Sequence, residues 1–104
     1  MLSVRNELRA RLNSGETIVA PGAYDALGAR IVEAMGFPAV YVGGYMSGAH
    51  LAVTEPLMTM TEQVDVAKRV AGAVNLPVIC DGNAGFGDPV HTMRAVRTFE
   101  DAGL

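Results

Sequence analysis

Short apolar runs alternate with longer segments of helical period along this chain. Three of the runs are TIVA (17–20), AVYV (39–42) and PVIC (77–80), and each is followed within two residues by glycine or proline. Runs that are this short, apolar throughout and rich in β-branched residues are typical of strands in a parallel sheet. They predict three parallel strands.

Segments with apolar residues at helical spacing lie between and around these runs. They predict four helices, over residues 3–14, 26–35, 59–74 and 89–102. Each starts at or just after a residue type that caps helix N-termini, namely Ser3, Asp25, Thr59 and Asp88. Thr59 and Glu62 also have the spacing of a capping box, in which each side chain binds the backbone N–H of the other.

The alternation of strands and helices predicts an α/β fold with a parallel sheet covered by helices. Four apolar residues of the last helix are expected to point inward: Val90, Met93, Val96 and Phe99. In folds of this class the loops after the carboxyl ends of the strands form the functional site. The candidate site therefore lies in the loops 21–25, 43–58 and 81–88.

The length indicates how much of such a fold is present. A closed (β/α)8 barrel takes eight units and roughly 250 residues. The 104 residues here supply about three parallel βα units in one domain, residues 1–104. Two interpretations follow: the N-terminal part of a barrel, truncated after about three units, or a small open sheet whose edges a partner chain covers.

The composition narrows the class of partner. Half of the residues are apolar and the net charge is −3, as in globular domains. The absence of a basic cluster argues against nucleic acid, and no apolar run reaches the roughly 18 residues that span a membrane. Charges interrupt the N-terminus MLSVRNELRARL, so no signal peptide is expected. A single cysteine, Cys80, fits a reducing cytoplasm.

Polar groups and glycines gather where the third predicted strand ends, in VICDGNAGFGDP (78–89). Asp81 offers the hard oxygen that Mg²⁺ prefers, and Asn83 lies on the same side of the chain if the backbone stays extended. The glycines allow a ligand to approach the backbone closely, and exposed N–H groups can bind an anion. The same letters are also ordinary turn chemistry, so a plain βα loop competes with an ion site.

Three segments together resemble the isocitrate lyase / phosphoenolpyruvate mutase superfamily. They are APGAYDALGARIVEAMGFPAVYVGG (20–44), TEPLMTMTEQVDVAKRV (54–70) and PVICDGNAGFGDPVHTMRAVRTFEDAGL (77–104). The resemblance implies a (β/α)8 barrel that binds Mg²⁺ and a small 2-oxo or 2-hydroxy carboxylic acid. It also implies a homo-oligomer, which is a tetramer in this family.

The activity implied by the resemblance is that of a lyase. Such an enzyme cleaves a C–C bond adjacent to a 2-oxo acid enolate, as 2-methylisocitrate lyase and oxaloacetate decarboxylase do. One alternative is a C–P bond enzyme, similar to phosphonopyruvate hydrolase or phosphoenolpyruvate mutase. Another is a truncated family member without catalytic activity, which serves as an assembly partner or is a remnant.

The resemblance also assigns roles to residues of the loops. Asp81 matches the acid that approaches Mg²⁺ most directly, beside the substrate. Asn83 stands where the family usually has a second aspartate, which acts through a metal-bound water. Tyr41, Gly43 and Gly44 match a Tyr-x-Ser-Gly strand end that binds the substrate's carboxylate, with Gly43 in place of the serine.

Other candidates carry weaker assignments. Glu55 lies near the family's acid in the second loop, through an alignment that needs a one-residue gap, and is expected behind the direct ligands. The catalytic residues are unknown, because the family's catalytic cysteine loop and glutamate follow a fourth strand. Cys80 is interpreted as core packing. His50 and His91 have no second histidine at metal-ligand spacing and are expected at the surface.

Overall fold

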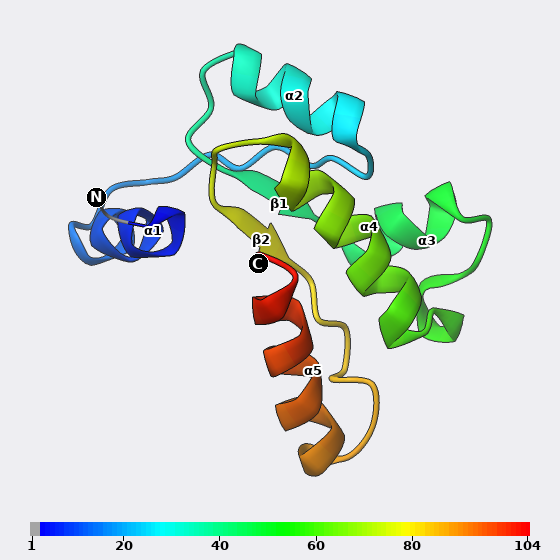
Figure 1. The fold of residues 1–104 in the computed structure, drawn as a ribbon. Helices are drawn as coiled ribbons and strands as arrows, with labels where there is room; N and C mark the ends of the chain where they lie inside the picture. The colour runs from blue at the N-terminus through cyan, green and yellow to red at the C-terminus, as the bar shows by residue number, and fades with distance from the viewer. Residues whose placement is uncertain (1–2) are drawn as a thin grey trace.

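The structure is a computed structural model that describes residues 3–104. Its elements in chain order are α1 (Val4–Asn13), α2 (Ala26–Ala34), β1 (Val40–Val42), α3 (Gly44–His50), the short 3-10 helix η1 (Glu55–Leu57), α4 (Met60–Ala73), β2 (Val78–Cys80) and α5 (Pro89–Asp101). In Figure 1, α2 and α4 lie across the two strands, while α5 extends away from them. No helix in the described part is long and apolar enough to cross a membrane.

The two strands form a parallel pair, as predicted. Val40 pairs with Val78, Tyr41 with Ile79 and Val42 with Cys80. The strands predicted at 39–42 and 77–80 are thus confirmed, and each begins one residue later than predicted. The parallel arrangement brings the carboxyl ends of both strands to the same edge of the sheet.

The strand predicted at 17–20 is wrong. The chain instead meets β1 slightly later, at one bridge between Gly22 and Tyr41. There Tyr41 N donates to Pro21 O and Ala23 N donates to Tyr41 O, both at 2.9 Å. The next bond in this register would run from residue 21 to the carbonyl of Ala39. Pro21 has no N–H, so the ladder stops there.

One face of the sheet carries the core. Buried side chains from the strands and from two helices form it: Ala29 and Val32 of α2, Val40 and Val42 of β1, Val66, Ala67 and Val70 of α4, and Val78 of β2. The alternate strand residues point the other way, and Tyr41 and Ile79 are 36% and 37% exposed. Within residues 3–104 the sheet is therefore covered by helices on one face only.

The predicted helix starts are confirmed by their caps. Asp25 Oδ1 accepts a hydrogen bond from Gly28 N at 2.7 Å, and Ser3 caps α1 in the same manner. Thr59 and Glu62 form the complete capping box at the start of α4. These side chains satisfy N–H groups that have no partner within the helix, which is why the sequence alone locates them.

The segment 43–58 is not the plain loop that was expected, because α3 and η1 lie within it. The inward side of α3 consists of small residues, Gly44, Ser47 and Gly48, and all three are buried. A Cβ on Gly48 would lie 2.6 Å from Val53 O, so the returning chain passes against the helix backbone. Glycine disfavours helices intrinsically; tertiary packing stabilises this one.

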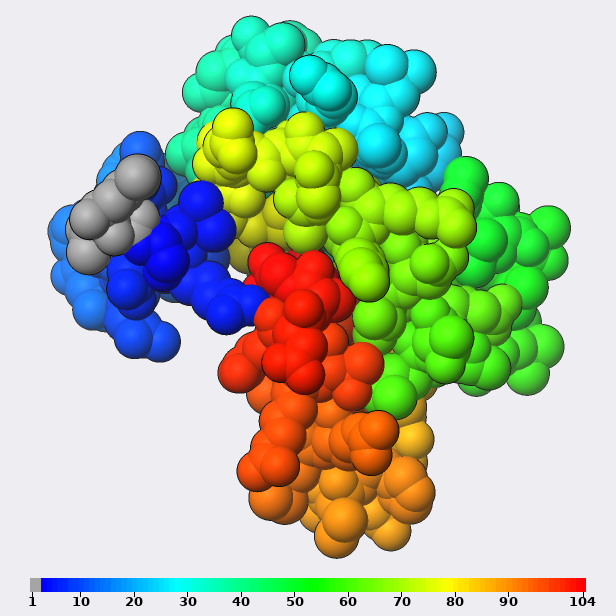
Figure 2. Space-filling model, in the orientation of Figure 1, coloured from blue at the N-terminus to red at the C-terminus, as the bar shows by residue number. Residues whose placement is uncertain are grey.

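The inward face predicted for α5 is wrong at three of four positions. Val90, Met93 and Val96 are 73%, 63% and 52% exposed, whereas Ala95 is 3% exposed. Phe99 is half-buried and lies beside Phe86, with ring centroids 6.2 Å apart. The helix α5 projects from the body of the molecule (Figure 2). Its apolar residues Val90, Met93 and Val96 are therefore left exposed within residues 3–104.

Candidate metal and carboxylate site

Two predicted residues meet where the strands end. Asp81 follows β2 directly, and its N–H donates to Val42 O at 2.9 Å, which fixes the exit of β2 against β1. Tyr41 lies on the uncovered face of the sheet, and its hydroxyl is 3.4 Å from Asp81 Oδ2. This is a long hydrogen bond, so the phenol and the carboxylate are neighbours with little constraint on either.

The backbone turns immediately after Asp81 rather than staying extended. Asp81 Oδ1 accepts a hydrogen bond from Asn83 N at 2.7 Å, and Asn83 has a φ of +50°. Asparagine is one of the residues that tolerate this left-handed conformation. The two side chains are therefore not placed by strand alternation, and the turn alone decides where Asn83 points.

Asn83 and Glu55 converge over Gly44. A Cβ built on Gly44 would collide with both Glu55 Oε1 and Asn83 Oδ1. The two oxygens thus occupy the space that any side chain at position 44 would fill. Glu55, which was expected behind the direct ligands, is the first residue of η1. Glycine is required at position 44 because of this close approach.

The neighbouring Gly43 lies against the tyrosine. A Cβ on Gly43 would be 3.2 Å from Tyr41 Cε1, and the residue is buried. Its carbonyl accepts a hydrogen bond from Ser47 Oγ at 2.7 Å, which ties the strand exit to α3. The structure therefore brings all the predicted site residues to one edge of the sheet: Tyr41, Gly43, Gly44, Glu55, Asp81 and Asn83.

Burial and negative charge act on two titratable groups here. Burial raises the pKa of Tyr41, and the adjacent Asp81 carboxylate raises it further, so the hydroxyl stays protonated as a donor. Burial raises the pKa of the Cys80 thiol to about 11, only partly offset by a hydrogen bond from Gln63. A thiol that stays neutral at physiological pH agrees with the interpretation of Cys80 as packing.

The donor set suits a hard cation. Asp81 and Glu55 provide carboxylates, and Asn83 provides an amide oxygen that is buried without a hydrogen-bond partner in the described part of the chain. A buried acceptor without a partner is destabilising, and a cation or a water bound to it would relieve this. Within residues 3–104 no three His, Cys, Asp or Glu side chains surround one point. Mg²⁺ keeps several waters and needs only one or two carboxylates, so the residues fit it.

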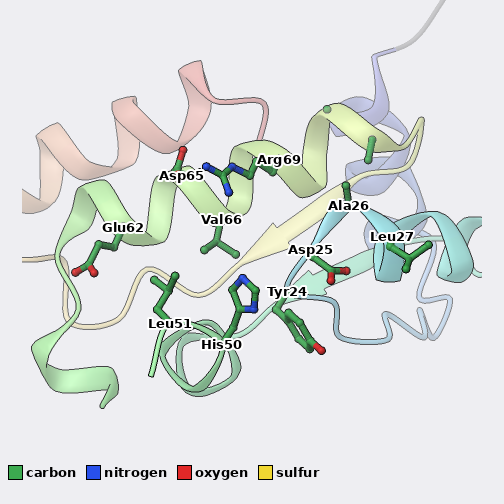
Figure 3. Close-up of a pocket in the computed structure, with 12 residues that line it drawn as sticks. Tyr24, Asp25, Ala26, Leu27, His50, Leu51, Glu62, Asp65, Val66 and Arg69 are labelled. Carbon is green, nitrogen blue, oxygen red and sulfur yellow. Dashed lines mark ion pairs between the residues drawn. The ribbon is translucent and has the colours of Figure 1, made fainter. Parts of the chain in front are cut away.

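The two histidines lie at the surface, as predicted. His91 Nδ1 is 2.7 Å from Asp88 Oδ1, and both side chains are well exposed. His50 stacks on Tyr24 with ring centroids 4.8 Å apart. Figure 3 shows this pair in a groove between α2, α3 and α4, near the exposed ion pair of Asp65 and Arg69. This groove is separate from the site at Asp81.

Sequence reasoning missed Gln63. It lies on α4, is fully buried, and its Nε2 donates to Asp81 O at 3.0 Å. The available signal was its spacing: Gln63, Val66 and Val70 fall on one helix face, so a polar residue occupied a core position.

A sequence model of the family described as phosphoenolpyruvate phosphomutase matches residues 8–104. The chain belongs to the phosphoenolpyruvate phosphomutase family. This family member is 43% identical over 100 residues to 2,3-dimethylmalate lyase of Eubacterium barkeri, covering 94% of this chain and 35% of the relative. It is 44% identical over 100 residues to isocitrate lyase of Haloferax volcanii, covering 94% of this chain and 29% of the relative.

Solved structures agree with this assignment. Phosphonopyruvate hydrolase in complex with oxalate and Mg²⁺ has a TM-score of 0.93 at 30% identity, over 98% of this chain and 36% of that one. A 2,3-dimethylmalate lyase of the PEP mutase/isocitrate lyase superfamily has a TM-score of 0.90 at 29% identity, over 100% of this chain and 38% of that one. The family member described here spans about a third of the length of the curated relatives that it matches.

Proposed function

We propose that this chain provides the metal and carboxylate site of an Mg²⁺-dependent lyase, which cleaves a C–C bond adjacent to a 2-oxo acid enolate. The observation that carries the proposal is the convergence of Glu55 and Asn83 over Gly44, beside Asp81. Relatives named as lyases of dimethylmalate and isocitrate, and a decarboxylase of oxaloacetate, support this chemistry. The proposed setting is the N-terminal part of a (β/α)8 barrel, in a cytoplasmic homo-oligomer.

Each residue has a proposed task. Asp81 and, through water, Asn83 would hold Mg²⁺, with Glu55 behind them. When bound, the ion stabilises the negative charge that develops on the enolate oxygen. The N–H groups of Gly43 and Gly44 and the Tyr41 hydroxyl would orient the substrate's carboxylate. We place the group that transfers the proton outside residues 1–104, as the family resemblance implies.

Binding of Mg²⁺ and oxalate tests the proposal, because oxalate is a planar dicarboxylate that resembles the enolate of a 2-oxo acid. Calorimetry is expected to show oxalate binding that requires Mg²⁺. Asp81→Asn should weaken it at least about tenfold, since a charged ligand is lost. Asp65→Asn is the matched control, because Asp65 is exposed on α4 and pairs with Arg69. Oxalate binding that does not depend on Mg²⁺ would contradict the proposal, and so would an equal loss of oxalate affinity in the two variants.

C–P bond chemistry is the second candidate. It is favoured by the family model, which is named for a phosphomutase, and by the similarity to phosphonopyruvate hydrolase. The products separate the two chemistries. Hydrolysis of phosphonopyruvate releases phosphate together with pyruvate, whereas a C–C lyase releases a second carbon compound. Phosphate release from phosphonopyruvate by the oligomer would favour this candidate.

A non-catalytic role is the third candidate. The replacement of the family's second aspartate by Asn83 and of its serine by Gly43 favours it, because the first change removes a negative charge and the second removes a hydroxyl group that the family uses. In this case the chain would assemble with other subunits without binding Mg²⁺ and oxalate. Light scattering, combined with the binding titration, distinguishes an assembled but non-binding chain from an active one.

A further inference from the structure

Gln63 is a fully buried polar side chain in the core of the molecule. It lies on the face of α4 that packs on the sheet, 18 residues before Asp81 in the sequence. Its Nε2 donates to the backbone carbonyl of Asp81 at 3.0 Å. The other donor to this carbonyl is the Cys80 thiol, at the longer distance of 3.5 Å. Gln63 is thus the main hydrogen-bond donor to the backbone carbonyl of the residue proposed to bind the metal.

The orientation of the Gln63 amide is determined by this contact. A carbonyl oxygen only accepts hydrogen bonds, so the amide nitrogen must face Asp81 and the amide oxygen must face away. The oxygen, Oε1, is buried and has no hydrogen-bond partner among the described residues. An apolar side chain would avoid this unpaired acceptor, so stability alone does not explain glutamine here.

We propose that Gln63 is a positioning residue for the metal site, which holds the strand exit at Asp81 so that its carboxylate and the turn to Asn83 keep their geometry. The backbone is fixed on both sides of Asp81: Asp81 N donates to Val42 O on β1, and Asp81 O accepts from Gln63 on α4. With the peptide groups held, Asp81 Oδ1 can accept from Asn83 N at 2.7 Å. Partners of this kind commonly change metal affinity 10- to 100-fold when they are removed.

The inference rests on the proposed function for its metal, so the test includes a readout that needs no metal. We would compare Gln63→Met, which keeps the length of the side chain and removes the donor, with Val70→Ala. Val70 is buried on the same face of α4, two turns further along, and loses packing without touching Asp81. In the metal-free full chain, amide hydrogen exchange at Asp81 and Asn83 should be about tenfold faster in Gln63→Met than in Val70→Ala.

Mn²⁺ alone is the second probe, measured by the electron paramagnetic resonance signal of the free ion. Gln63→Met should weaken Mn²⁺ binding about tenfold, while Val70→Ala leaves it unchanged. Exchange rates at Asp81 and Asn83 that are equal in the two variants would overturn the inference. If exchange rises as expected but the unsubstituted chain binds no Mn²⁺, the proposed function fails and the positioning role stands.

A measurement on the unsubstituted chain covers the case in which Gln63→Met does not fold. The Nε2 protons of Gln63 should exchange slowly with solvent, and a coupling across the hydrogen bond to the Asp81 carbonyl should be detectable by NMR. Fast exchange of these protons, at the rate of an exposed amide such as that of Asn75, would overturn the inference.

Discussion

The two faces of the small parallel sheet differ in what they carry. One face, with Val40, Val42 and Val78, is buried under α2 and α4. The other presents Tyr41 and Ile79, which are about one third exposed, and leads to Asp81 at the strand exit. Neighbouring residues of a strand point to opposite faces, so three residues of β1 serve both packing and chemistry. Substitutions on the two faces should therefore have different consequences.

The largest effect is expected on the covered face. Val40→Ala would leave a cavity at a fully buried position, with a loss of about 2–3 kcal/mol in the free energy of unfolding. Ile79→Val, on the open face, removes one methylene from a partly exposed side chain and should lose under about 1 kcal/mol. Urea denaturation of both variants checks this. Equal losses would mean that the open face is covered in solution, for example by another subunit.

The rate at which the Cys80 thiol is alkylated measures how well the covered face of the sheet shields it from solvent. Since burial raises its pKa from 9.0 to about 11, the native thiol should react with iodoacetamide at pH 8 about a hundredfold more slowly than the same thiol in the urea-unfolded chain. Mass spectrometry of timed samples gives both rates. A native rate close to the unfolded one would show that the C-terminal end of β2 opens readily.

The same pKa predicts how stability changes in alkaline solution. The folded pKa lies above the unfolded one, so the stabilising contribution is complete below about pH 9 and is lost as the pH rises toward 11. Cys80→Ala should remove this part of the pH dependence. Denaturation midpoints between pH 8 and pH 11 test it, and parallel profiles for the two proteins would contradict the assigned cause.

Gly44→Ala should disturb the site through close packing. The added methyl group would meet the Glu55 and Asn83 oxygens, so we expect a loss of about 1–3 kcal/mol in stability together with weaker Mg²⁺ binding. Gly72→Ala is the control, because a Cβ there meets no atom within 4 Å and alanine favours a helix interior by about 0.5–1 kcal/mol. The melting temperature should fall in Gly44→Ala and rise in Gly72→Ala. An unchanged stability of Gly44→Ala would show that the two oxygens do not converge there.

Asn83→Asp is expected to have the smallest effect, and it should strengthen Mg²⁺ binding rather than weaken it. A carboxylate in place of the amide adds a negative charge next to Asp81 and should tighten Mg²⁺ binding about tenfold. The gain should shrink at high salt, because the added attraction is electrostatic. Isothermal titration at two salt concentrations measures both. Weaker binding in Asn83→Asp would mean that repulsion among the acids outweighs attraction to the ion.

Local chemistry was enough to locate much of the fold. The caps at Asp25, Thr59 and Asp88 depend on residues within three positions, and the structure has them all. The apolar runs ending at Val42 and Cys80 located both strands. Polar residues directly after apolar runs also indicated the candidate site, since the ends of parallel strands share one edge.

Contacts between distant residues were beyond such reasoning. The strand predicted at 17–20 does not form, because its pairing with β1 would need an N–H at Pro21 for bonding to Ala39 O, and proline has none. The helix α3 has a glycine-rich sequence and forms because its small residues pack closely against the returning chain. The apolar stripe of α5 has no partner within residues 3–104, so its periodicity did not indicate the buried face.

The sequence by itself determined the starts of α1, α2, α4 and α5, the two paired strands and the positions of Tyr41, Gly43, Gly44 and Asp81 near the strand exits, because these depend on local hydrogen bonding and on side-chain alternation. Only the tertiary structure decided that Glu55 and Asn83 share the space above Gly44, and that Gln63 supports Asp81 from α4. Those contacts join residues separated by 11 to 39 positions. Their geometry results from how the helices pack on the sheet, which local sequence patterns do not encode.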